Sequence, residues 1–121
     1  MHPDVEDYYW IMAARRRLIA IDGAGTGLCT FFVLQREEEV ATFYDRKCWS
    51  TPPDHAEGSI IYFDKLVCTH FTKALWQAIT QRVTEVIPQW ERFVWYRPGQ
   101  DADRRYTWNR PKEGRWRRPT P

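Results

Sequence analysis

Apolar positions in the second half of the chain alternate between strand-like runs and one helix-like stretch. The strand-like runs are Ile60–Cys68, Phe93–Tyr96 and Arg105–Trp108, and a helical pattern covers about Thr69–Ile87 and ends before Pro88. A strand that leads through a helix to a second strand predicts a parallel crossover unit. In such units the helix N-terminus is a common place to bind an anion or a cofactor phosphate.

The predicted helix has one apolar stripe that is expected to face a sheet. Its members are Phe71, Leu75, Ala78, Ile79, Val83 and Val86. Thr69 is expected to cap the start by accepting a backbone N–H. In the last strand, Tyr106 and Trp108 should share one face.

The first half of the chain predicts a helix and a hairpin, followed by an ambiguous segment. Helical spacing runs from Val5 to Arg17, and the arginine triplet 15–17 is expected to end this helix in solvent. Leu18–Asp22 and Leu28–Leu34 flank a glycine-rich turn, which favours a β-hairpin. A phosphate-binding loop is rejected because β-formers follow the glycines and no Lys-Ser or Lys-Thr does. The signal from Gln35 to Tyr44 is ambiguous; one interpretation is a short helix that Glu37-Glu38-Glu39 opens, with Val40, Phe43 and Tyr44 on its inner face.

Composition describes one globular domain of 121 residues with 43% hydrophobic and 28% charged residues. No run approaches the roughly 20 apolar residues that span a bilayer, and the acidic start is not a secretory signal, so a cytoplasmic location without membrane contact is expected. The three scattered cysteines lack metal-ligand spacing and favour free thiols. We therefore expect no metal site and a domain over residues 1–110.

Charge is uneven along the chain. From Trp90 to Pro121 nine Lys and Arg stand against four Asp and Glu, a net +5, which leaves −3 on the first 89 residues. The tail 111–121 carries much of this excess, and such a tail either neutralises nucleic-acid phosphates or extends into solvent. His55, in the loop before Ile60, is expected to be solvated.

Polar groups at the junction of strand and helix are the candidates for chemistry. Strict alternation puts Asp64 on the same face as Tyr62, Leu66 and Cys68. A carboxylate among apolar neighbours serves as a base if its pKa is raised, or it pairs with Lys73 or an arginine of the next strand; we favour pairing. The helix start with Thr69, Thr72 and Lys73 suffices in principle for a pyrophosphate.

The element order resembles a small, degenerate member of the GNAT N-acetyltransferase superfamily. The resemblance covers about Val5–Arg110 and is centred on Gly58–Trp95. It implies an α+β domain with a mixed, mostly antiparallel sheet, flanking helices and one parallel strand–helix–strand crossover. It also implies a transfer of an acyl group from acetyl-CoA or another acyl-CoA to an amine.

The resemblance assigns roles residue by residue. Acyl-CoA would contact Leu66, Val67 and Cys68 through the backbone, and its pyrophosphate would face Thr69, Thr72 and Lys73. Glu57 or Asp64 would relay the amine proton, and Tyr96 or Tyr106 would protonate the leaving thiolate. The strands 60–68 and 92–96 should run parallel and part at Val67, leaving room for pantetheine.

Two features depart from the family pattern. The pyrophosphate loop is normally basic and glycine-rich, whereas here it reads Cys68-Thr69-His70-Phe71-Thr72-Lys73, and the helix after the fifth strand is missing. Similar losses occur in bacteriophage-encoded relatives, so a phage or mobile-element origin is a further expectation.

The alternative is a non-enzymatic binding or assembly module. Exposed Trp90, Trp95, Trp108 and Trp116, interleaved with arginines, would dock a protein partner or stack on single-stranded nucleic acid. Core packing is the competing interpretation for Trp95 and Trp76.

Overall fold

A computed structural model describes residues 5–22, 26–46 and 54–112. The elements in chain order are α1 (Val5–Ala14), β1 (Leu18–Ile21), β2 (Gly27–Leu34), α2 (Glu37–Arg46), β3 (Ile60–Cys68), α3 (Lys73–Val86), β4 (Arg92–Arg97) and β5 (Arg104–Asn109). The five strands form one sheet in sequence order. All neighbours are antiparallel except β3 and β4, which are parallel and joined through α3. The predicted mixed sheet with one crossover is confirmed.

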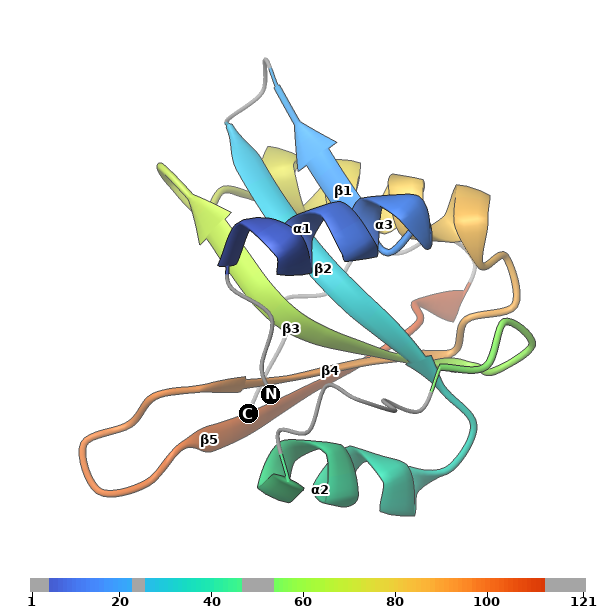
Figure 1. The fold of residues 1–121 in the computed structure, drawn as a ribbon, viewed down its shortest axis with the longest axis vertical. Coiled ribbons are helices and arrows are strands. Elements are labelled where there is room, and N and C mark those ends of the chain that lie inside the picture. The colour runs from blue at the N-terminus through green and yellow to red at the C-terminus, as the bar shows by residue number, and fades with distance from the viewer. Residues whose placement is uncertain (1–4, 23–25, 47–53, 113–121) are drawn as a thin grey trace.

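The sheet is covered on both faces (Figure 1). On one face α3 packs onto a core that includes Phe31, Phe63, Phe93 and Trp108. On the other face α1 and α2 cover a second core. Its buried members are Tyr8, Met12, Phe32, Leu34, Val40, Ile60, Tyr62 and Val94. This three-layer arrangement follows from strands that are apolar on both sides, as β2 and the first half of β3 are.

The helix α3 begins four residues later than predicted. Thr72 is the N-cap, and its hydroxyl accepts the Leu75 N–H at 3.1 Å, so the expected cap at Thr69 is wrong. Phe71 therefore lies before the helix and is 53% exposed. The face toward the sheet carries Leu75, Trp76, Ile79 and Val83. The predicted stripe was extended too far at both ends, because Val86 is exposed as well.

The end of α1 also differs from the prediction. Arg16 adopts a positive φ of 58° and closes the helix after Ala14. Arg17 then turns inward, is 7% exposed, and pairs with Asp54 through Nε at 3.0 Å. Its guanidinium also lies over the Phe31 ring. The prediction that all three arginines 15–17 lie in solvent is therefore wrong for Arg17, which is buried.

The structure also tests the predicted hairpin, the possible second helix and the exposure of His55. The hairpin of β1 and β2 and the helix α2 are confirmed, with Val40 buried and Tyr44 half-buried. His55 is not merely solvated, because its Nε2 pairs with Glu39 at 2.9 Å. Burial raises the pKa of Glu39, but hydrogen bonds from His55 and from the N–H groups of Gln35 and Arg36 outweigh it and lower that pKa. The glycine turn 23–25, Cys48, the Phe43 side chain and the tail from 113 lie outside the described residues.

Candidate functional site

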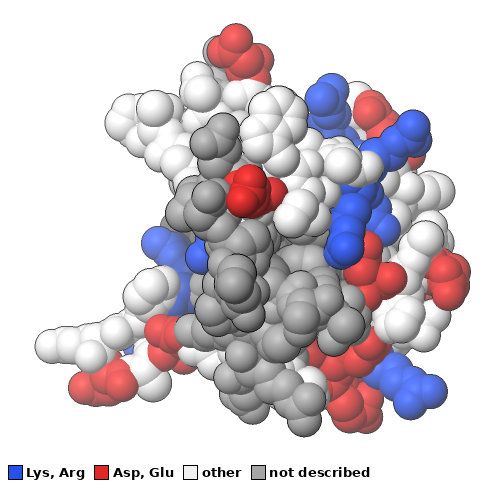
Figure 2. Space-filling model, viewed as in Figure 1, with Lys and Arg blue, Asp and Glu red and all other residues white. Residues whose placement is uncertain are grey.

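The parallel pair β3–β4 is joined over only part of its length. Its register is Ile60↔Arg92, Ile61↔Phe93 and Tyr62↔Val94, after which both strands continue without pairing to each other. Strand β3 runs on to Cys68 along β2, while β4 runs on to Arg97 along β5. Figure 1 shows the two strands diverging, and Figure 2 shows the surface indented between their ends. The predicted parting is confirmed, but it begins at Phe63 and not at Val67.

A β-bulge explains why the strands part so early. Thr30 pairs with Lys65 and Phe31 pairs with Phe63, so Asp64 is an extra residue in β3. A bulge bends its strand and increases the local twist. Because the extra residue comes two positions after the last β3–β4 pair, it turns β3 away from β4.

The bulge also reverses the faces predicted for the end of β3. Leu66 now lies opposite Cys29, and Cys68 packs against the core under α3. Asp64 instead faces α1, so the expectation that it shares a face with Leu66 and Cys68 is wrong. Strict alternation fails there because the bulge shifts the pattern by one residue.

Asp64 accepts a hydrogen bond from a residue that was not among the predicted partners, Lys73 or an arginine of the next strand. The Tyr8 hydroxyl donates to Asp64 Oδ2 at 2.6 Å and lies 2.7 Å from Thr30 Oγ1. Burial, followed by the charge of Asp64, raises the pKa of Tyr8 well above its ordinary value. Tyr8 thus stays protonated and orients the half-buried carboxylate. No sequence signal connects these residues, which are 56 positions apart.

The two predicted tyrosine acids lie on opposite faces of the sheet. Tyr96 stacks on Tyr44 from α2 with ring centroids 3.9 Å apart, and it lies 6.2 Å from the Tyr62 ring. Tyr106 pairs with Trp95 across the β4–β5 ribbon and stacks on it. Tyr62, which sequence reasoning did not single out, has its pKa raised by burial first and then by Asp64. Asp64 and Tyr96 therefore share a face with Tyr62, and Tyr106 does not.

The predicted cofactor-binding residues surround the open end of β3. Leu66, Val67 and Phe71 are exposed apolar side chains there, with Val67 58% exposed. Thr69 donates its N–H to the Thr26 carbonyl, and Thr72 caps α3 immediately before Lys73. Glu57, the second candidate proton relay, is exposed and accepts from Gln35. The structure thus places the backbone and apolar candidates together, with Glu57 on the segment before β3.

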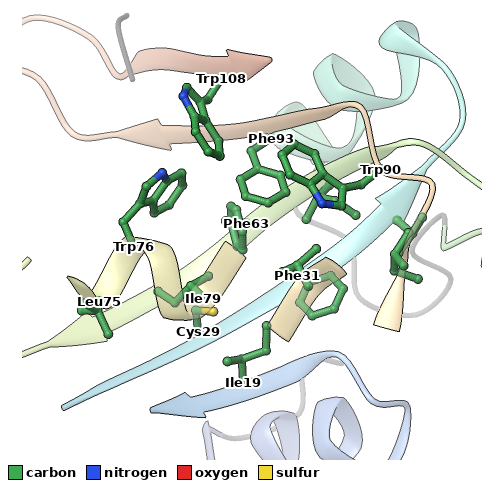
Figure 3. Close-up of a cluster of buried hydrophobic side chains, with 14 residues drawn as sticks. Ile19, Cys29, Phe31, Phe63, Leu75, Trp76, Ile79, Trp90, Phe93 and Trp108 are labelled. Atoms are coloured by element: carbon green, nitrogen blue, oxygen red, sulfur yellow. The ribbon is translucent and has the colours of Figure 1, made fainter. Parts of the chain in front are cut away.

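Aromatic rings fill the α3 side of the opening. Trp76 lies 5.2 Å from Trp95 and 5.9 Å from Phe63, centroid to centroid. Trp90 and Trp108 are 1% and 4% exposed. The binding-module alternative predicted that both are exposed, and that prediction is wrong. Both belong to the core under α3: Trp108 lies in β5, and Trp90 lies on the segment between α3 and β4 (Figure 3).

Charge in the described chain does not gather into one patch on the face shown. Figure 2 shows Lys and Arg interspersed with Asp and Glu there. Cys29 and Cys68 are free thiols, and burial raises the pKa of Cys29 to about 12. No helix within the described ranges is long and apolar enough to cross a membrane. Comparisons of the chain with protein-family models, with curated proteins and with solved structures find no match.

Proposed function

We propose that this chain is a small GNAT-like domain that binds an acyl-CoA thioester in the opening between β3 and β4 and transfers its acyl group to an amine. One observation carries the proposal: the parallel pair opens after Tyr62↔Val94, and the crossover helix α3 begins near the open end of β3. The opening leaves strand edges whose main-chain groups suit an extended, amide-bearing chain.

The binding chemistry follows from the order of groups along β3. The edge of β3 from Phe63 onward offers main-chain donors and acceptors to the amides of pantetheine. Leu66, Val67 and Phe71 supply apolar surface for its methylenes. The start of α3, with Lys73 in its first turn, favours the anionic pyrophosphate.

Transfer requires one proton to leave the amine and one to reach the leaving sulfur. The deprotonated amine attacks the thioester carbonyl carbon, the C–S bond breaks, and the thiolate takes up a proton. In the proposal Asp64, held by Tyr8, accepts the amine proton. Tyr96 lies on the same sheet face as Asp64 and supplies the proton to sulfur, whereas Tyr106 lies on the opposite face, against Trp95.

Binding is tested by the thermal stability of the protein with acetyl-CoA. A ligand at 100 times its Kd adds about 2.7 kcal/mol to the free energy of unfolding. The variant Val67→Glu places a negative charge at the open end, and we expect it to weaken acetyl-CoA binding roughly tenfold. Val86→Glu is the matched control, because Val86 is also exposed but lies in the last turn of α3.

Two results would refute the proposal. One is an unchanged melting temperature of the wild-type protein in millimolar acetyl-CoA. The other is equal loss of affinity in the two valine variants. Release of free thiol from acetyl-CoA in the presence of a panel of primary amines then reports whether bound thioester is turned over.

A further inference from the structure

Trp76 carries a buried hydrogen-bond donor that has no acceptor within the part of the chain that the structure describes. The residue is 3% exposed, so water does not reach its indole nitrogen from the surface. A buried N–H without a partner is rare in folded proteins, and each instance calls for an explanation. Trp90 shows the ordinary case, since its Nε1 donates to Thr84 Oγ1 at 2.8 Å.

This donor lies where the sheet opens. Trp76 is in the first turn of α3, and its ring contacts Phe63 and Trp95, the first residues beyond the last β3–β4 pair. Figure 3 shows its nitrogen on the edge of the ring remote from α3. The orphaned donor and the opening are independent observations that coincide in space.

One ring among the neighbours of Trp76 is largely exposed. Phe71 lies 5.6 Å from Trp76, centroid to centroid, and is 53% exposed. It belongs to the segment between β3 and α3, outside any helix or strand. Among the other neighbouring rings, Phe63, Phe93 and Trp108 are buried in the core and Trp95 is half-buried. Of these rings Phe71 is the most exposed, so it is the one that a ligand would displace with the least loss of buried surface.

We propose that the Trp76 indole N–H donates a hydrogen bond to a carbonyl oxygen of the acyl-pantetheine arm, which enters between β3 and β4 as Phe71 swings aside. This inference rests on the proposed function and identifies a protein donor that binds the acyl-pantetheine arm. The surroundings select the class of acceptor. An amide or thioester carbonyl is uncharged and suits an aromatic enclosure, whereas a phosphate there would lose its hydration without a counter-charge.

The test compares two buried indoles, one whose donor is unsatisfied and one whose donor is satisfied. Trp76→Phe and Trp90→Phe both keep an aromatic ring and remove an N–H. Because one neutral hydrogen bond contributes modestly to affinity, we expect Trp76→Phe to bind acetyl-CoA about three- to tenfold more weakly by calorimetry. Trp90→Phe should bind with wild-type affinity.

A second measurement uses the wild-type protein and does not depend on a variant folding. In a ¹⁵N-labelled sample, the indole Hε1 resonance of Trp76 should move downfield on addition of acetyl-CoA, while that of Trp90 stays in place. If acetyl-CoA binds but Trp76→Phe retains full affinity and the resonance does not move, this inference is overturned and the proposed function stands. If the wild-type protein does not bind acetyl-CoA, both are overturned.

Discussion

Replacing Tyr8 with phenylalanine removes one hydroxyl that links α1 to two strands. The hydroxyl donates to Asp64 at 2.6 Å and lies 2.7 Å from the hydroxyl of Thr30. Thr30 is fully buried and Tyr8 is 9% exposed, so water replaces the lost bonds poorly. The variant tests whether α1 is held to the bulge in β3 by this contact.

The magnitude follows from the two bonds. A hydrogen bond to a charged group contributes about 1.5–3 kcal/mol, and a neutral bond contributes about 0.5–1.5 kcal/mol. Asp64 is only half-buried, which places its share at the lower end. We expect Tyr8→Phe to lower the free energy of unfolding by about 2–3 kcal/mol, a large part of the stability of a small domain.

The assay is urea unfolding at neutral pH, followed by far-UV circular dichroism. Tyr9→Phe is the matched control on the same helix, because within the described chain the Tyr9 hydroxyl makes no hydrogen bond. In a Thr30→Val background the effect of Tyr8→Phe should shrink, since one of the two bonds is already gone. Equal stabilities of Tyr8→Phe and Tyr9→Phe would refute this account of the bulge contact.

Three further outcomes are expected. Asp54→Ala leaves Arg17, which is 7% exposed, without its ion-pair partner, and it should lower the free energy of unfolding by about 2–4 kcal/mol in urea. A loss below about 0.5 kcal/mol, the size of an ordinary surface change, would contradict a buried ion pair between the two residues. Because the pKa of Glu39 is lowered on folding, its stabilising contribution is complete above the unfolded pKa and is lost as pH falls, so wild type and Glu39→Gln should converge in stability in acid and differ near neutrality. In a Cys48→Ser background, iodoacetamide should modify half-buried Cys68 well before buried Cys29, and acetyl-CoA should slow the first reaction; equal rates would argue against the core placement of Cys29.

Much of the fold is predictable because local pattern and final packing agree. The bounds of β3 follow from the apolar run Ile60–Cys68, and the parallel crossover follows from a strand, a helix and a strand in that order. The helix start was misplaced because both Thr69 and Thr72 are good caps, and the sequence offers no means to choose between them. Tertiary packing makes that choice, with Gly27 of β2 leaving room for Leu75.

The candidate site was less predictable, for a physical reason. A bulge depends on the pairing register of two strands, so a single polar residue such as Asp64 is not enough to predict it from the sequence. The partner of Asp64 comes from α1, and the unsatisfied indole of Trp76 is visible only once its surroundings are known. These features belong to long-range packing, which periodicity does not encode.

In the proposed function, β3 and β4 part after Tyr62↔Val94 and acyl-CoA occupies the parting. Amide hydrogen exchange followed by NMR reports on both the parting and its occupancy. In the free protein, amides of β3 that face β4 should be protected up to Tyr62 and should exchange fast from Phe63 onward. Saturating acetyl-CoA should protect those fast amides and leave the β2-facing ones unchanged. Protection of the whole β4-facing edge in the free protein, or no gain of protection with acetyl-CoA, would contradict the account.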